Sequence, residues 1–263
     1  MNVIHEAQTQ TGSRRQRARR QRVEEILSTA LVLIEEQGLD ALTVQKLAKR
    51  MDWAVGALYR YYAGKDALFA ALQTRVLAEY SASLEAALAR AYGAAPESAR
   101  TTAPRPDSDR ALEAVAFIAE HYRAYAAAHP TRFRMISLSL GEPRELLDDE
   151  QAGRVMQSGL TLLGAVAQRV QRAADAGALE PGNALARTLV FWSSVQGVLL
   201  MRKLQRLAPA VIDIDALFVD AVVALLCGYG AERARAEQAV ARAREALAEI
   251  PIDLSTPSED EDA

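Results

Sequence analysis

Three short stretches decide the fold of this chain: TVQKLA at residues 43–48, VGALYRYY at 55–62 and GKDAL at 64–68. The first begins with Thr43, a residue type that caps helix N-termini, and its apolar residues follow at helical spacing. Two breaks in this spacing separate the three stretches. We therefore expect two short helices joined by a tight turn, and then a longer helix that begins at Lys65.

Helical patterns also dominate the rest of the sequence. Apolar residues from Val23 to Ile34 recur at helical spacing, and Gly38 follows where a helix-ending glycine is expected. No segment shows the alternation of a half-buried strand, so the predicted fold is all-α. Further helices are expected near residues 110–128, 131–140, 152–176, 184–207 and 213–227, with an exposed helical extension at 231–248.

Charge is distributed unevenly along the chain, and this suggests its organisation. Residues 14–22 carry six arginines and no acidic residue, whereas the net charge of the whole chain is −3. A basic end on an acidic body is typical of a protein that contacts a polyanion at that end. We expect a basic flexible arm, a helix-turn-helix domain, a larger helical domain and an acidic disordered tail, at residues 1–20, 21–66, 67–249 and 250–263.

Catalytic and metal-binding patterns are missing from the sequence. It has three histidines and one cysteine, and it contains no Gly-rich phosphate loop, no HExxH and no CxxC. We therefore expect no catalytic residue, no metal site and no cofactor. A lone cysteine fits a reducing compartment, and no apolar stretch is long and uncharged enough for a membrane span. These features predict a cytoplasmic protein without membrane contact.

The pair of short helices is the informative feature for function. Two helices joined by a tight turn can place the second helix in the major groove of DNA. Hydroxyl and ammonium groups that can hold phosphates surround them, and six arginines stand just upstream. An ordinary solvated surface explains any one of these side chains, but the whole set favours double-stranded DNA as partner.

The three stretches together resemble the N-terminal signature of the TetR family of transcriptional regulators. The resemblance implies an all-helical homodimer with an N-terminal three-helix helix-turn-helix domain that binds palindromic operators, and a larger domain for ligand binding and dimerisation. It implies that Thr43, Tyr59 and Lys65 hold phosphates, that Tyr61 lies beside them, and that positions 54–57 face the bases.

Positions 54–57 read Ala-Val-Gly-Ala, whereas the family usually has a polar residue among them. This stretch can contact thymine methyl groups but offers no hydrogen bond to guanine. Neighbouring residues, DNA shape or the arm must then contribute to specificity; the arm either enters the minor groove or only anchors on phosphates. Trp53 either caps the helix pair or reaches DNA. The residues expected at DNA are Arg14, Arg15, Arg17, Arg19, Arg20, Thr43, Gln45, Lys46, Trp53, Ala54, Val55, Ala57, Tyr59, Arg60, Tyr61 and Lys65.

The larger domain is expected to hold a hydrophobic or amphipathic small molecule and a dimer seam. Plain core packing is the alternative for each pocket candidate taken singly. These candidates are Phe117, His121, Tyr122, Tyr125, Phe133, Met156, Leu160, Trp192 and Gln196, with His121 and Gln196 as polar contacts. The dimer candidates are Val195, Leu199, Val219, Val222 and Val223.

Three functions compete on these observations. The first is a homodimeric repressor released from its operator by a small-molecule inducer. The second is a DNA-binding regulator or architectural protein without a ligand. The third is a helical interaction protein whose basic arm binds RNA or a membrane.

Overall fold

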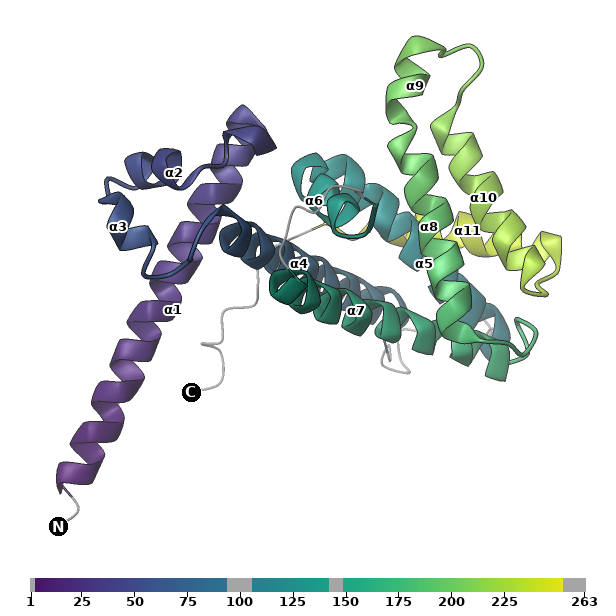
Figure 1. Ribbon diagram of the computed structural model, residues 1–263. Coiled ribbons are helices and arrows are strands. Elements are labelled where there is room, and N and C mark those ends of the chain that lie inside the picture. Colours follow the sequence, from purple (N-terminus) through teal and green to yellow (C-terminus); the bar gives the residue numbers. More distant parts are fainter. Residues whose placement is uncertain (1–2, 94–105, 142–148, 253–263) are drawn as a thin grey trace. The chain divides into compact units, whose positions relative to one another are not determined.

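The computed structural model describes residues 3–93, 106–141 and 149–252 (Figure 1). Within these residues every regular element is a helix, and the all-α prediction is confirmed. The expected acidic tail, residues 250–263, lies outside the described residues from position 253 onward.

The chain divides into two compact units, and the boundary between them falls inside two of its helices. The first unit contains α1 (Val3–Gln37), a 3-10 turn (Leu39–Ala41), α2 (Val44–Arg50), α3 (Val55–Leu58) and the beginning of α4 (Lys65–Tyr92). The boundaries lie between Arg75 and Val76 and between Val155 and Met156, so the described residues from Asp149 to Val155 also belong to the first unit. The second unit contains the rest of α4, then α5 (Asp107–Ala128), α6 (Pro130–Gly141), most of α7 (Asp149–Asp175), α8 (Ala184–Leu200), α9 (Arg202–Leu207), α10 (Ile214–Gly228) and α11 (Arg233–Ala248).

Helix α1 is longer than the apolar pattern that predicted it. It begins at Val3, so the arginines at 14–22 lie on a helix, where the sequence suggested a flexible arm. Arginine, glutamine and alanine are strong helix formers, and a helix already fixed by packing from Ile26 onward extends without a new nucleation step. The helix ends as expected, because Gly38 takes a φ of +84° that other residues rarely adopt.

The first unit is held by an apolar core and by polar contacts, including two that involve α2. Buried side chains from α1, α2, α3 and α4 form the core, among them Ile26, Leu47 and Leu72. At the start of α2 the Lys46 backbone N–H donates to the Thr43 hydroxyl at 3.1 Å, which is the predicted N-cap. Arg50 donates two hydrogen bonds to the Glu36 carboxylate, at 2.6 and 2.8 Å, and fastens α2 to α1.

Helix α5 is the centre of the second unit, and α11 packs along it. The expectation of an exposed extension at 231–248 was wrong, because Ala236, Ala239, Val240 and Ala243 are buried against the unit. Small side chains at these spacings let two helix backbones approach closely. Three arginines of α11 also pair with acidic residues of α5: Arg235 with Asp109, Arg242 with Glu113 and Arg244 with Glu120.

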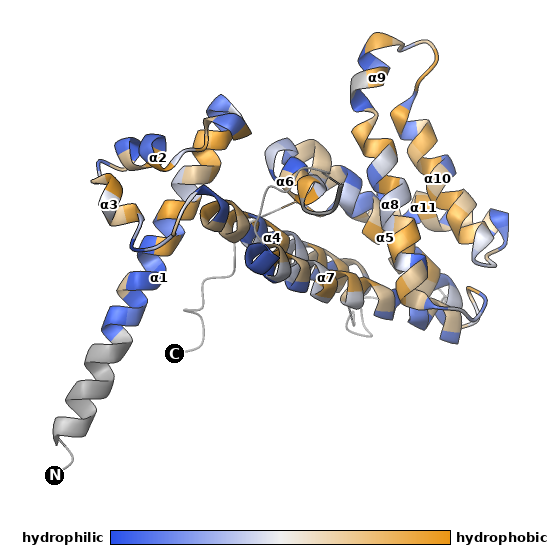
Figure 2. Ribbon diagram, in the orientation of Figure 1, coloured by the Kyte–Doolittle hydropathy of each residue, from blue (hydrophilic) through white to orange (hydrophobic). Residues whose placement is uncertain are grey.

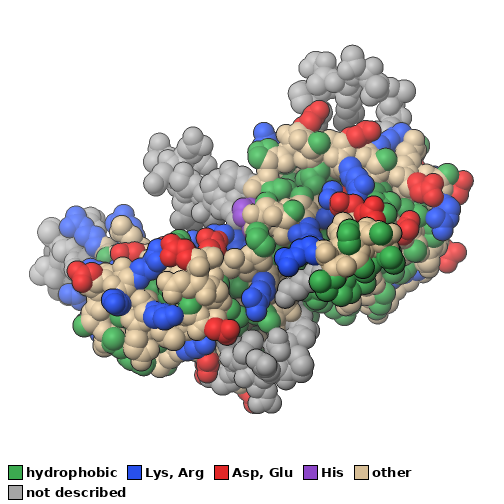
Figure 3. Space-filling view, turned by 90° about the horizontal axis from the view of Figure 1, so that it is seen from above, with side chains coloured by type: hydrophobic (Ala, Val, Ile, Leu, Met, Phe, Trp, Pro, Cys, Tyr) green, Lys and Arg blue, Asp and Glu red, His purple; other side chains and the backbone are tan. Residues whose placement is uncertain are grey.

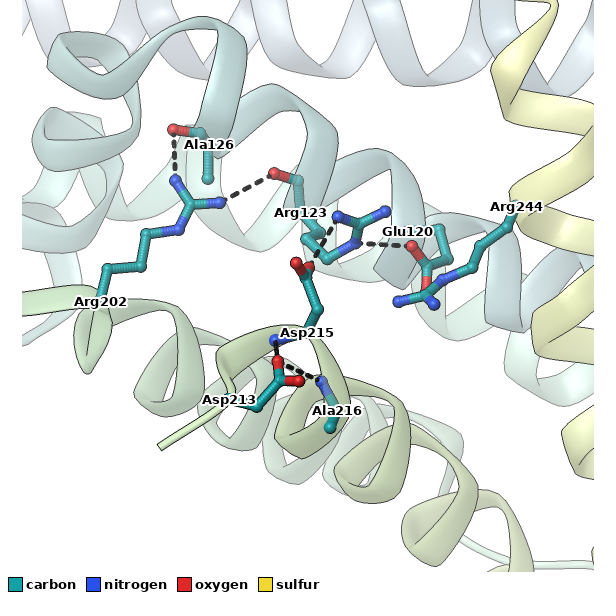
Figure 4. Close-up of polar contacts among 8 residues, drawn as sticks. All are labelled: Glu120, Arg123, Ala126, Arg202, Asp213, Asp215, Ala216 and Arg244. Carbon is teal, nitrogen blue, oxygen red and sulfur yellow. Dashed lines mark hydrogen bonds and ion pairs between the residues drawn. The ribbon is translucent and has the colours of Figure 1, made fainter. Parts of the chain in front are cut away.

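A polar network ties α5 to α9, α10 and α11 (Figure 4). The buried Glu120 carboxylate accepts from Arg244 at 2.8 Å and from Arg123 at 2.7 Å. Arg123 also donates to Asp215 at the start of α10, and Arg202 at the start of α9 donates to the backbone of α5. The Glu120 carboxylate thus links α5 to α11, and Arg123 extends the network to α10.

Candidate functional site

The two short helices of the first unit form a helix-turn-helix. Asp52 takes a φ of +54° in the turn, and the Trp53 N–H donates to the Ala48 carbonyl at 2.9 Å. This turn redirects the chain into α3. Ala54 stands at the N-cap of α3 and makes no side-chain hydrogen bond there, in agreement with its lack of an oxygen. The structure therefore places residues 54–57 at the start of a helix whose N-terminal N–H groups are not capped by a side chain.

The expected DNA-contacting residues lie mostly on the exposed surface of this unit. Ala54, Val55 and Gly56 are exposed, and so are the arginines from Arg14 to Arg22 on α1. The Tyr59 side chain is 49% exposed directly after α3. The other exposed candidates are Gln45, Lys46, Arg60 and Lys65, whereas Thr43, Trp53, Ala57 and Tyr61 are half-buried.

Trp53 packs between α1 and the segment that follows α3. Its ring lies 6.1 Å from the Tyr61 ring, and the Arg22 guanidinium lies over it at 5.4 Å from the centroid. A cation above an indole face is a favourable arrangement. These contacts favour the packing role for Trp53 over direct contact with DNA.

The second unit contains a cavity of about 50 Å³. Helices α4, α5, α6, α7 and α8 all contribute to its wall, and none of the described residues that line it carries a charge. Thr188 on α8 gives this wall a buried hydroxyl: the residue is 1% exposed, and no described residue is a hydrogen-bond partner of its hydroxyl. The lining residues are Leu77, Tyr80, Ile118, Ala119, Tyr122, Ile136, Gly159, Leu162, Leu163, Val166, Thr188, Phe191, Trp192 and Val195.

The structure brings two of the nine pocket candidates, Tyr122 and Trp192, to this cavity. Gln196 lies behind the wall, where its amide nitrogen donates to Ser137 at 2.5 Å and its oxygen accepts from the Tyr122 hydroxyl. The others lie elsewhere, because the candidate positions span more than one face of their helices. Phe117, His121, Tyr125 and Phe133 are core residues, and Met156 and Leu160 are exposed on α7.

Thr188 is the residue that sequence reasoning missed. It stands four positions before Trp192, and residues at that spacing share one face of a helix. The signal in the sequence is a polar residue, Thr188, on the same helix face as Trp192.

Burial sets the protonation of the groups beside the cavity. It lowers the pKa of His121 to about 4, so this histidine is neutral at pH 7. Its Nε2 lies 3.2 Å from the Ser83 hydroxyl, and Tyr80 and Phe117 contact its ring. Burial also raises the pKa of Tyr122 and of Tyr80, which keeps both phenols neutral.

Four of the five expected dimer residues are core residues of one chain. Val195, Leu199, Val222 and Val223 are almost completely buried, because α8 and α10 pack against each other through them. Val219 is half-buried. These four side chains are therefore not on the surface of a single chain.

Exposed apolar residues occupy other faces of the same helices. In the view from above, hydrophobic side chains gather on the second unit (Figure 3), and α8 and α10 are largely apolar (Figure 2). The segment Ala184–Leu207 is long and apolar enough to cross a membrane. This is weak evidence for a membrane span, because the core helix of a soluble protein can pass the same test. We call the following set the apolar face: Leu185, Leu189, Val190, Leu200, Met201, Leu204, Leu207, Val211 and Leu217.

Comparisons with known proteins agree with this architecture. The family model of bacterial regulatory proteins of the tetR family matches residues 26–72, and a tetracyclin repressor-like C-terminal domain matches residues 115–226. An uncharacterised HTH-type transcriptional regulator of Mycobacterium tuberculosis is 27% identical over 206 residues, which cover 78% of this chain and 80% of the relative.

Solved structures show the same fold. A protein of unknown function from Rhodococcus sp. RHA1 is 21% identical with a TM-score of 0.59, over 79% of this chain and 94% of that one. SmeT, the repressor of the Stenotrophomonas maltophilia multidrug efflux pump SmeDEF, is 19% identical with a TM-score of 0.52, over 79% and 89%. The helix-turn-helix, the helical second unit and both family matches lead to one conclusion: this chain belongs to the TetR family of DNA-binding transcriptional regulators.

Proposed function

We propose that the protein is a homodimeric cytoplasmic repressor that leaves a palindromic operator when a small neutral molecule enters the cavity of the second unit. The observation that carries this proposal is an uncharged cavity with one unpaired hydroxyl, in a chain that also has a helix-turn-helix. The fold neighbour SmeT is a repressor, which supports the direction of the response.

The first unit supplies the DNA contacts in this proposal. The exposed residues 54–56 at the start of α3 present methyl groups and N–H groups to the major groove. Methyl groups recognise thymine, so the base preference of this stretch is for A·T pairs. Gln45 and Arg60 are exposed next to it and supply hydrogen bonds to base edges or phosphates.

A second copy of the chain covers the apolar face. Leu204 and Leu207 on α9 are 44% and 80% exposed, and several exposed large apolar side chains on neighbouring helices are typical of an interface. A two-fold dimer buries the same face of both copies. Such a dimer places its two recognition helices at the spacing of two half-sites that lie one turn of DNA apart.

The cavity selects neutral, mostly apolar ligands with one hydrogen-bonding group. No lining residue can pair with a carboxylate or an ammonium group, and Arg132 nearby on α6 is paired with Glu79 at 3.2 Å. A water needs roughly 10–15 Å³ in such a cavity, so about 50 Å³ admits only a few non-hydrogen atoms. A larger ligand enters only if the wall moves.

Helix α4 couples ligand binding in the cavity to DNA binding by the helix-turn-helix. It begins at Lys65 directly after the helix-turn-helix, and its residues Leu77 and Tyr80 line the cavity. A ligand that requires more room favours a conformation in which α4 has shifted, and so lowers operator affinity. The effect is limited by the difference between the ligand's affinities for the two conformations.

The first experiment selects bound duplexes from a random library with the purified full chain at physiological salt. Enrichment of a palindrome with half-sites one turn apart supports a sequence-specific dimer. Recovery of DNA without a motif favours the architectural alternative, and failure to retain DNA favours the interaction protein.

The second experiment tests the ligand by thermal unfolding with phenol, toluene and benzoate. At ten times its Kd a ligand of the folded state stabilises by about 1.4 kcal/mol, a rise of several degrees in Tm. We expect a rise with phenol, a smaller one with toluene and none with benzoate. In Thr188→Val the difference between phenol and toluene disappears. A rise with benzoate alone contradicts the neutral ligand class.

A further inference from the structure

An open cationic groove lies in the first unit, between α1 and the segment that directly follows α3. Arg15, Arg19 and Arg22 of α1 line it together with Arg60 and Tyr61, which follow α3, and Ala18 completes the wall. Its volume is about 490 Å³, and none of the described residues that line it is acidic. The groove thus combines four guanidinium groups from two segments that are far apart in the sequence.

Helix geometry explains which arginines take part. Positions 15, 19 and 22 are spaced by four and three residues, so their side chains lie on one face of α1. Arg17 and Arg20 lie on the opposite face of the same helix and are exposed. The sequence contains one run of arginines, but the helix divides it into two sets with different surroundings.

Contacts at the base of the groove hold it in shape. The Arg22 guanidinium lies over the Trp53 ring, and that ring packs against Tyr61. Glu24, the first acidic residue after the arginines, is paired with Arg75 at 3.1 Å. The arginines of the groove are therefore attached to a folded surface, whereas entry into a minor groove by an arm requires an extended, free segment.

The dimensions of the groove suit the backbone of a duplex. Arg15 and Arg22 are seven residues apart, which is about 10 Å along a helix. A DNA strand carries one phosphate per about 3.4 Å of axis, so this row faces about three phosphates. Arg60 comes from the segment directly after α3, so the groove adjoins the helix that faces the bases.

We propose that this groove binds backbone phosphates of the operator beside the half-site that α3 contacts. The inference rests on the proposed function and adds to it a phosphate clamp on α1. The groove raises affinity and its dependence on salt, and it leaves the choice of bases unchanged, because phosphates carry no sequence information.

The test compares two double variants of the full chain that remove the same charge from the same helix. The groove variant, Arg15→Gln with Arg19→Gln, removes two of the positive charges that line the groove. The matched control, Arg17→Gln with Arg20→Gln, removes two positive charges from the opposite face of α1. All four positions are exposed, and far-UV circular dichroism checks that both variants fold. Affinity for the selected operator is measured between 50 and 300 mM salt.

Each lost phosphate contact lowers the slope of log K against log [salt] by about 0.9. For the groove variant we expect the slope to fall by about 1.8 per subunit, with equal proportional losses on the operator and on an operator with altered flanking bases. The control changes the slope by less than half as much. Ethylation of the flanking phosphates should weaken the native protein and the control, but not the groove variant.

Three results overturn the proposal. Equal slopes for the two variants mean that charge on α1 acts without the groove. A loss in the groove variant that depends on flanking A·T pairs means that arginines read the minor groove. If the native chain selects no operator, the proposed function fails as well, whereas the first two results leave operator binding intact.

Discussion

The buried His121 should make the stability of the second unit depend on pH. Burial lowers the pKa of this histidine to about 4, whereas an unfolded histidine has a pKa of 6.5. Between these two values the unfolded chain binds a proton that the folded chain excludes, so stability falls as the pH falls below 6.5. The ring is surrounded by Ser83, Tyr80 and Phe117, and none of these groups supplies a negative charge that could stabilise the imidazolium.

The size of the effect follows from the two pKa values. At pH 5 the unfolded histidine is almost fully protonated, whereas the folded one is protonated in about a tenth of the molecules. Integrated between pH 7 and pH 5, the difference in proton binding lowers the free energy of unfolding by about 2 kcal/mol. A change of this size in a domain of this length shifts Tm by about 4–8 °C.

Urea unfolding of the native chain and of His121→Gln at pH 7 and at pH 5 measures this contribution. Glutamine can still bond to Ser83 but does not titrate. Carboxylates also respond to acid in both proteins, so the informative quantity is the difference between their losses of stability. We expect the native chain to lose about 2 kcal/mol more than the variant. Equal losses would refute the argument that burial of His121 makes folding sensitive to acid.

Four further substitutions test other contacts. Thr43→Ala removes the N-cap of α2 and should cost about 1 kcal/mol of stability, measured by urea unfolding. Glu120→Ala leaves two arginines without their buried carboxylate and should cost about 3 kcal/mol; Arg154→Ala, in an exposed ion pair, should cost less than about 1 kcal/mol by the same assay. Leu204→Arg places two charges in the proposed two-fold interface and should raise the dimer Kd at least about 100-fold in sedimentation equilibrium, whereas an unchanged Kd would move the interface elsewhere.

Local signals along the chain were sufficient for the helix-turn-helix. Thr43 caps α2 through its own hydroxyl, Gly38 ends α1 with a positive φ, and Ala54 leaves α3 without a side-chain cap, all as the residue types predict. These features depend on neighbours within four positions, so a single sequence contains the physics that determines them. The family resemblance rests on the same short stretch.

The faces of the long helices depend on packing partners that the sequence does not identify. Val195 on α8 and Val222 on α10 are apolar, and so are Leu185 on α8 and Leu217 on α10, yet the first pair is core and the second is exposed. Hydrophobic spacing shows that a helix has an apolar side, but α8 and α10 have more than one. Only the packing of these two helices against each other decides which residues the chain buries and which stay exposed.

The sequence by itself determined the all-α fold, the order of the helices and the position of the DNA-binding motif. Tertiary structure decided where Thr188 meets the cavity, that α11 is part of the core, and that Arg15 and Arg19 share a groove with Arg60 while Arg17 and Arg20 do not. The physical reason is the range of the interactions. Caps and helical periodicity act over one or two turns, whereas cavities, ion pairs between helices and charged grooves are made by residues that only folding brings together.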